Sequence, residues 1–357
     1  MEQARLTRLR QLMGERNLQA LLVTGGYNRR YMSGFTGSSG ALLITADKAV
    51  LLSDFRYRTQ APQQAIHYEF VEHKPKLIET VKELLHDWKV AELGFEQQDV
   101  SYGTYAGYAE ALPGVKLVPT GSLIEELRMV KDDAELAVMQ EAAELADRTF
   151  EHMLGFLKPG LKESDVALEL EFYMRRHGAT STSFETIVAS GERSALPHGK
   201  ASDRVLRSGE FVKLDFGAYY KGYCSDITRT VMLGKPTPKH REIYDIVLEA
   251  QLHTLDQIRP GMTGQQGDAL ARDVIAKYGY ADFFGHGTGH GLGLEIHEAP
   301  RLSVTGDVVL KPGMTVTVEP GIYLPDFGGV RIEDDIVMTD TGMRRLTQSR
   351  KDFIIIE

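Results

Sequence analysis

The sequence predicts an amino-terminal α/β domain followed by a larger α+β domain that is built from two related halves. Three observations support this prediction. The chain has 357 residues, which is enough for about two domains. Apolar runs of strand length alternate with helical patterns over roughly the first 120 residues. Beyond them, a strand pattern that ends in an acid and a glycine turn occurs twice.

The first domain is predicted from the spacing of its apolar residues. Helices are expected at residues 3–17, 77–88 and 105–112, where apolar side chains recur at helical spacing. Strands are expected at residues 20–24, 41–45, 49–53 and 91–95. The glycine-rich segment 28–40 is interpreted as a loop, which either connects a helix to a strand or overhangs a functional cleft.

The second domain is expected to begin with a long helix. Asp132 or Asp133 is a suitable N-cap, and a Pro-Gly pair at Pro159 ends the helix near residue 157. The same order of helix end, Pro-Gly turn and second helix returns at Pro260. The predicted boundaries are therefore 1–125 for the first domain, 126–132 for a linker and 133–357 for the second domain.

A repeated segment brings an acid to the end of each of two strands. Residues 206–219 and 310–323 share Leu, Gly, Val, an acid, Gly and Tyr at one constant offset. The acid is Asp215 in the first copy and Glu319 in the second. Each copy reads as a strand that stops at a glycine turn.

A second acid follows each copy after another short apolar run. These acids are Asp226 and Glu333. We expect the two halves to face each other across a pseudo-twofold axis, with the sheet carrying all four acids and the helices on its other side. Neighbouring carboxylates disfavour each other's charged form, so they need cations nearby. The sequence therefore predicts a pair of bound divalent metal ions.

Histidines give the next signal. Residues 285–298 contain five glycines and three histidines, namely His286, His290 and His297. Glycine allows the backbone to approach a site closely, so we expect at least one of these histidines to be a metal ligand. The segment is not a zincin helix, because the second histidine of that motif is missing and a proline follows.

Three further residues lie close to the repeated segments. His198 precedes the first copy by eight positions and is either a functional or an ordinary loop histidine. Arg331 would share a face with Glu333 if that segment is a strand, where it would act in the site or only pair with the acids. Cys224 is interpreted as a buried thiol rather than a nucleophile, because the nearby acids raise the pKa of a thiol.

Composition excludes several classes of function. The net charge of −9 does not favour binding to nucleic acid or to an anionic membrane. The single cysteine excludes an internal disulfide framework and fits a reducing compartment. No apolar run reaches the ~18 residues of a membrane span. We therefore expect a cytoplasmic protein.

These motifs resemble those of the pita-bread metallopeptidases, and specifically the group of Xaa-Pro dipeptidase (prolidase) and aminopeptidase P. The resemblance covers most of the chain, including an amino-terminal domain of the creatinase and prolidase type. The motifs that carry it are Leu-Asp215-Phe-Gly, Ser-Asp226-Ile-Thr-Arg-Thr, His-Gly-Thr-Gly-His290-Gly-Leu-Gly, Thr-Val-Glu319-Pro-Gly and Arg-Ile-Glu333-Asp-Asp.

The resemblance implies a role for each candidate residue. The implied metal ligands are Asp215, Asp226, His290, Glu319 and Glu333, with Asp226 and Glu333 bridging two ions. His198 and His297 match the histidines that contact the substrate, and Arg331 matches an arginine that supports the site. Tyr219 and Tyr323 are weaker candidates for residues around the ligands.

The resemblance also implies a reaction. The expected enzyme is a hydrolase that cleaves the bond between an amino-terminal residue and proline. Two divalent ions, with Mn favoured over Co or Zn, would hold a bridging hydroxide that attacks the scissile carbonyl. His297 or His198 would stabilise the oxyanion, and Glu319 would carry the proton.

Several alternatives stay open at this stage. The motifs do not decide between a dipeptidase and an aminopeptidase for longer peptides. The chain could also be a non-catalytic binding protein or a creatinase-like amidinohydrolase on the same fold, although the complete ligand set disfavours both. The expected partner is a small peptide with proline at its second position, and the family suggests a homodimer.

Overall fold

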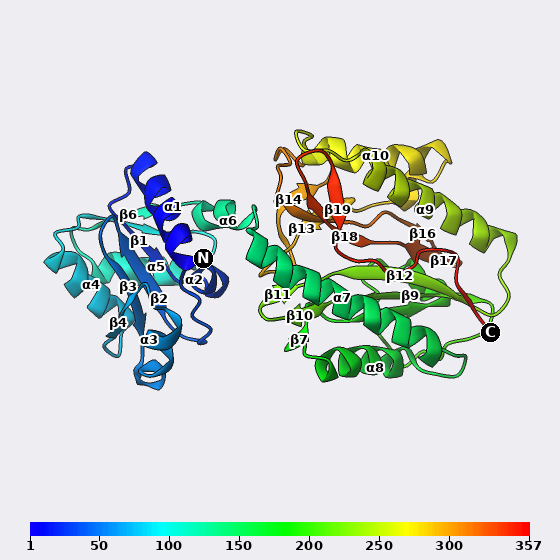
Figure 1. Cartoon of the computed structure of the whole chain (residues 1–357), viewed down its shortest axis with the longest axis horizontal. Coiled ribbons are helices and arrows are strands. Elements are labelled where there is room, and N and C mark those ends of the chain that lie inside the picture. Colours follow the sequence, from blue (N-terminus) through cyan, green and yellow to red (C-terminus); the bar gives the residue numbers. More distant parts are fainter. The chain divides into compact units, whose positions relative to one another are not determined.

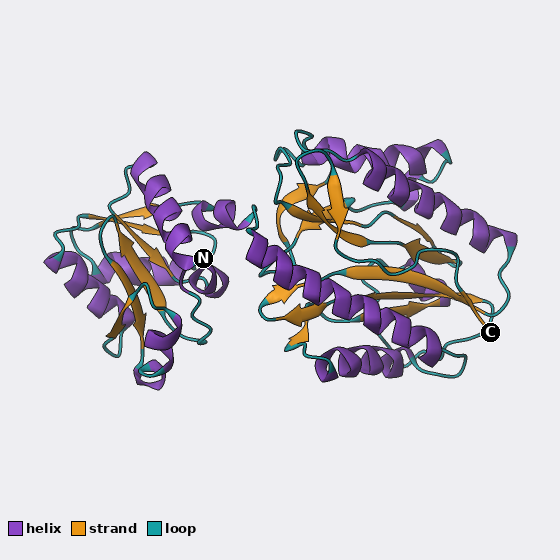
Figure 2. Cartoon of the chain, viewed as in Figure 1, coloured by secondary structure: helices purple, strands orange, loops and turns teal.

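The computed structural model describes residues 1–357 and contains two compact units, Met1–Arg128 and Met129–Glu357. Figure 1 shows both units along the chain, and Figure 2 shows that each combines helices with strands. This mixed architecture confirms the predicted fold class.

A six-stranded sheet forms the centre of the first unit, in the order β4-β3-β2-β1-β5-β6. Its strands are β1 (Ala20–Val23), β2 (Ala41–Thr45), β3 (Ala49–Ser53), β4 (Glu69–Glu72), β5 (Glu92–Phe95) and β6 (Lys116–Pro119). Strand β2 is antiparallel to both of its neighbours, whereas the outer pairs are parallel. Strands β4 and β6 were not predicted from the sequence, because they are short and only partly buried.

The helices of the first unit surround this sheet. They are α1 (Glu2–Glu15), α2 (Gly26–Ser33), α3 (Gln60–Gln64), α4 (Leu77–Asp87), α5 (Tyr102–Ala111) and α6 (Leu123–Arg128), with a short 3-10 turn η1 (Phe55–Tyr57). Side chains of α4, such as Val81 and Leu85, pack in one core cluster with Leu22, Leu43 and Leu93 from the sheet.

Helix α2 (Gly26–Ser33) corrects the first part of the interpretation of residues 28–40 as a loop, whereas residues 34–40 form a connection to β2. Glu96, which is distant in sequence, accepts hydrogen bonds from the backbone N–H groups of Thr24 and Gly25 just before the helix and from the side chain of Asn28 within it. These long-range contacts hold the segment where the helix begins. The helix ends at Gly34, whose φ of 73° is the left-handed conformation that suits a helix end.

The second unit contains the two helix pairs that the repeated Pro-Gly turns predict. They are α7 (Asp133–Phe156) with α8 (Glu163–Arg176), and α9 (Pro238–Gln257) with α10 (Gly264–Lys277). Asp132 caps α7 and forms a capping box with Glu135, which is the local pattern for a helix start. No helix of the chain combines the length and the apolar character needed to cross a membrane.

Two main sheets lie between these helix pairs (Figure 1). One contains β8 (Ile187–Ser190), β9 (Glu210–Phe216), β12 (Ile227–Leu233) and β20 (Ile355–Ile356). The other contains β13 (Gly289–Gly291), β14 (Glu298–Leu302), β15 (Thr315–Val318), β18 (Asp334–Met338) and β19 (Met343–Arg345). Shorter strands and turns are β7 (Ser181–Thr182), β10 (Ala218–Tyr220), β11 (Tyr223–Cys224), β16 (Gly321–Leu324), β17 (Gly328–Arg331), η2 (Gly191–Ala195) and η3 (Ala281–Phe283).

The strands repeat in the way the two acid-bearing segments predict. Strand β9 pairs antiparallel with β12, and β10 and β11 lie between them in the chain. In the second half, β15 pairs antiparallel with β18, and β16 and β17 take the intervening place. The four acids therefore occupy matching positions in two similar strand units.

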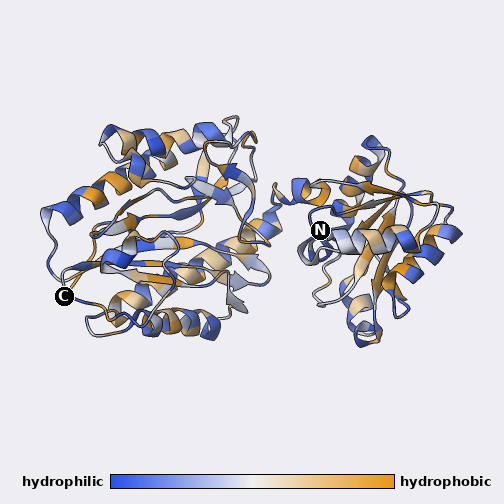
Figure 3. Cartoon of the chain, turned by 180° about the vertical axis from the view of Figure 1, so that it is seen from behind, coloured by the Kyte–Doolittle hydropathy of each residue, from blue (hydrophilic) through white to orange (hydrophobic).

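The helices bury the apolar faces of these sheets. Phe150 of α7 and Leu170 of α8 pack in one cluster with Leu214 and Val231 of the first sheet. In Figure 3, apolar and polar residues alternate along these helices, and the strands between them carry residues of both kinds. Burial of this kind contributes about 25 cal/mol for each Å² of apolar surface, so the packed helices stabilise the strands that carry the acids.

Candidate active site

A pocket of about 650 Å³ lies in the second unit. Its walls include every residue that the sequence analysis placed in a metal or substrate role. These residues are His198, Asp215, Asp226, His290, His297, Glu319, Arg331 and Glu333. The structure thus brings together side chains that are distant in the sequence, although their individual roles stay predictions.

The four acids stand at or beside the ends of strands. Asp215 is the second-last residue of β9, and Asp226 directly precedes β12. Glu319 directly follows β15, and Glu333 lies between β17 and β18. Because β9 pairs with β12, Asp215 lies opposite Thr228 and therefore close to Asp226.

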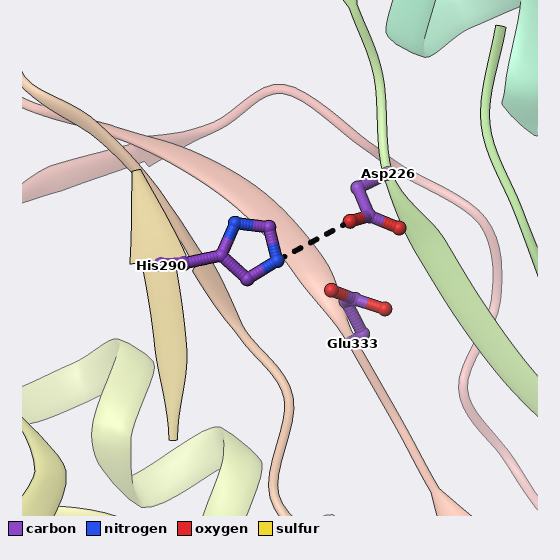
Figure 4. A group of neighbouring side chains, drawn as sticks. All are labelled: Asp226, His290 and Glu333. Atoms are coloured by element: carbon purple, nitrogen blue, oxygen red, sulfur yellow. Dashed lines mark ion pairs between the residues drawn. The ribbon is translucent and has the colours of Figure 1, made fainter. Parts of the chain in front are cut away.

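Two of these acids and His290 form a cluster suited to a metal ion. Asp226, His290 and Glu333 each offer a ligand atom, and these atoms lie within 4.8 Å of one another (Figure 4). The Nε2 atom of His290 is 3.5 Å from a carboxylate oxygen of Asp226 and 3.5 Å from one of Glu319. The Nδ1 atom of His290 donates to the carbonyl of Gly291, which leaves Nε2 free to act as a ligand.

The residues present fit a bound cation. The Oδ1 atom of Asp226 is buried and has no hydrogen-bond partner in the chain, and an unpaired buried carboxylate oxygen is costly. Carboxylate oxygens with one imidazole form a donor set that suits divalent ions such as Mn, Co or Zn. A cation in this pocket would give the unpaired oxygen a partner.

The protein alone does not favour the charged form of these acids. Burial raises the pKa of Asp226, and the charge of Asp215 raises it further. Burial likewise raises the pKa of Glu333, with an added contribution from Asp226, and burial also raises the pKa of Glu319. Divalent cations would reverse these shifts, because a nearby opposite charge favours the ionised form.

Arg331 connects the acids to the surrounding structure. Its guanidinium forms an ion pair with Asp215 and donates at 3.0 Å to the Thr228 hydroxyl, which in turn donates at 2.6 Å to Glu333. The segment is not one continuous strand, because β17 ends at Arg331 and β18 begins at Asp334. Arg331 and Glu333 meet through Thr228 and not along a shared strand face.

The two tyrosines that were weaker candidates, Tyr219 and Tyr323, differ in their distance from the site. Tyr323 accepts a hydrogen bond from Arg331 at 2.8 Å and lies 2.7 Å from Nε2 of His286. Because Nδ1 of His286 donates to a carbonyl, Nε2 accepts from Tyr323, and burial lowers the pKa of His286 to about 4. Tyr219 lies on β10, paired with Cys224, and does not line the pocket.

Some pocket residues were not found from the sequence. The apolar part of the wall comes from Phe184, Ile187, Pro197 and Ile296. These residues lie in loops or at strand ends and carry no recognisable motif, so only the fold shows that they face one cavity. Cys224 is buried, and burial raises the pKa of its thiol, which agrees with the prediction of an unreactive cysteine.

A pocket in which carboxylates and an imidazole converge within a duplicated α+β domain defines a metal-dependent hydrolase centre. Residues 137–340 match the model of metallopeptidase family M24, and residues 5–130 match the creatinase/prolidase N-terminal domain. The chain belongs to metallopeptidase family M24, and it is an enzyme of that class. The resemblance that the motifs indicated is therefore confirmed.

Known relatives span nearly the whole chain. An Xaa-Pro dipeptidase of Pyrococcus furiosus is 38% identical over 98% of this chain and 99% of its own length. The solved structure of an Xaa-Pro dipeptidase from Bacillus anthracis has a TM-score of 0.97 and 51% identity, over 99% of this chain and 100% of that one. An X-Pro aminopeptidase from Thermotoga maritima has a TM-score of 0.91 and 38% identity, over 98% and 100% of the two chains.

Replacing Asp226 by asparagine tests whether this acid holds metal. The variant Asp226→Asn should lower Mn affinity more than ~100-fold, because it removes a charge from the ligand set itself, where even the loss of an outer partner costs up to ~100-fold. The measurement is metal content after loading and dialysis. The control Asp245→Asn makes the same charge change on the exposed surface of α9. Full Mn content in Asp226→Asn would contradict the assignment.

Metal binding should release protons. Burial raises the pKa of Asp226 and Glu333 in the metal-free protein, and a carboxyl group must lose its proton to become a ligand. Mn affinity should therefore rise with pH. Calorimetric titration in two buffers of different ionisation enthalpy measures the number of protons released. A binding enthalpy that is the same in both buffers would show that the acids are already ionised.

Proposed function

We propose that this chain is a dinuclear metal-dependent exopeptidase that hydrolyses the bond between an amino-terminal residue and proline. The observation that carries the proposal is the convergence of four acids and His290 on one pocket that also contains His198, His297 and Arg331. The names of the relatives, which are Xaa-Pro dipeptidases and an X-Pro aminopeptidase, support the choice of substrate.

Two divalent ions balance the charge of four carboxylates. The residues that would hold them are Asp215, Asp226, His290, Glu319 and Glu333. When bound, the ions would lower the pKa of a coordinated water, so that it becomes a nucleophile at neutral pH, and they would polarise the scissile carbonyl. Mn is the favoured metal, with Co and Zn as alternatives that the donor set also accepts.

The side chains of the pocket then position the substrate and move the proton. His198 and His297 line the pocket and are suited to donate hydrogen bonds to the substrate carbonyl as it gains negative charge. Glu319 lines the pocket and accepts a hydrogen bond from Thr317 at 3.1 Å. A carboxylate beside the bound ions can take a proton and return it to the leaving amine.

The apolar wall suits a proline ring. The amide before proline carries no N–H group, so recognition depends on the shape of the ring and not on a hydrogen bond from that nitrogen. Phe184, Ile187, Pro197 and Ile296 offer apolar surface in the same pocket as the acids. We propose that they surround the ring of the second residue of the substrate.

A dipeptide is the favoured substrate. Arg301 lines the same pocket and forms no ion pair within the chain. A dipeptide that ends in proline has a free carboxylate on that ring, and a guanidinium binds carboxylate in two-point geometry. A longer peptide has no carboxylate at this position, so the aminopeptidase activity for longer chains is the alternative.

A comparison of Ala-Pro with Ala-Pro-Ala tests the proposed function. After chelation the protein should hydrolyse neither peptide, and added Mn should restore turnover of Ala-Pro more than that of Ala-Pro-Ala. Release of free alanine is the measurement. Activity that survives removal of the metal would contradict a metal-dependent hydrolase, and binding of both peptides without turnover would favour a non-catalytic binding protein. The homodimer and the cytoplasmic location stay predictions.

A further inference from the structure

His198 depends on its backbone for its position. It belongs to the long connection between β8 and β9, here called the His198 loop (residues 191–209). The imidazole faces the pocket and has no hydrogen-bond partner in the chain. Because the side chain is not held directly, the orientation of the ring follows from how the preceding loop residues are fixed.

A buried lysine fixes those residues. Lys213 lies on β9 and is completely buried. Its ammonium group donates hydrogen bonds to the carbonyl oxygens of Leu196 at 2.6 Å, Ser194 at 3.1 Å and Pro197 at 3.4 Å. An ammonium group has three N–H donors, and the loop supplies one carbonyl for each.

The same strand carries a metal-binding candidate. Lys213 and Asp215 are two residues apart on β9, so their side chains leave the same face of the strand. Arg331 of β17 contacts both this strand and the loop. It pairs with Asp215 and also donates to the carbonyl of Pro197 at 3.1 Å. The residue before His198 is thus joined through Lys213 and Arg331 to the strand that bears Asp215.

We propose that Lys213 is a positioning residue for His198. By holding three carbonyl groups of the His198 loop on β9, its ammonium sets the distance between the imidazole and the acids of the pocket. The inference rests on the proposed function, in which His198 contacts the substrate. It adds a residue that touches neither metal nor substrate and acts on the reaction through the loop.

General anchoring of the loop does not explain Lys213. The loop is already held by Glu163 of α8, which accepts hydrogen bonds from the backbone and hydroxyl groups of Ser190, just before the loop, and of Ser202, within it. Burial of an ammonium is costly, and an apolar side chain of similar volume would fill the core at lower cost. Lys213 instead contacts the carbonyls immediately before His198, which is where the ring is oriented.

A double-mutant cycle tests the inference. The variants are Lys213→Met, His198→Ala and the combination, assayed with Mn and Ala-Pro. Lys213→Met should lower kcat by about 100-fold, which is the effect of displacing a reacting group by ~1 Å, with a smaller change in KM and unchanged metal content. In the His198→Ala background the same substitution should have little further effect on kcat. Independent, additive losses would overturn the proposal.

Two controls separate positioning from stability. Ser202→Ala removes a hydroxyl that donates to Glu163 from the part of the loop after His198, and it should keep near wild-type kcat. An equal loss in Ser202→Ala would overturn the proposal, since any loosening of the loop would then suffice. If Lys213→Met does not fold, Lys213→Gln, which keeps two donors, should show a smaller loss of kcat with the same dependence on His198.

Hydrogen exchange gives a measurement that does not need turnover. Backbone amides of residues 196–200 should exchange faster in Lys213→Met, whereas those of β12 should not change. If the wild-type protein hydrolyses neither peptide but hydrogen exchange responds as described, the proposed function is wrong. The inference that Lys213 holds the His198 loop in place is then still supported. If the wild type is active and Lys213→Met matches it in both kcat and exchange, the positioning role is wrong.

Discussion

The mutual repulsion of carboxylates in a buried pocket is the constraint on which this structure depends. Asp226, Glu319 and Glu333 are held where burial raises the pKa of each. Strand pairing and helix packing must therefore supply the energy that keeps them together when no cation is present. A bound pair of divalent ions would remove this cost, so the fold and the metals stabilise each other.

The duplicated architecture makes the site a product of both halves. Hydrogen bonds join the halves directly at the acids: Thr228 of the first half donates to Glu333 of the second, and Asp335 of the second accepts from the backbone N–H of Asp226. The neighbouring contact of Arg331 with Asp215 has the same effect. Networks of this kind hold each member through several others, which suits a centre that needs fixed ligand positions.

The sequence showed the acids and histidines clearly because their pattern is local. Asp215 and Glu319 each stand at the end of a short strand and two residues before a glycine, and His290 lies in a segment rich in glycine. The helices of the second unit were also predicted well, since caps such as Asp132 and the Pro-Gly turns act within a few residues. Helix α2 was missed, because the contacts at its start come from Glu96, which is distant in sequence and follows strand β5. The apolar pocket wall and the contacts of Lys213 were hidden for the same reason: they join residues that only the folded chain brings together.

Anomalous diffraction from Mn-loaded crystals tests the central claim most directly. The claim is that these acids are tolerated together because they share a pair of divalent cations. Data collected at the Mn absorption edge should show two neighbouring peaks, both bounded by Asp215, Asp226, His290, Glu319 and Glu333. A pocket without anomalous density at saturating Mn, or peaks that lie only on surface acids elsewhere, would contradict the account.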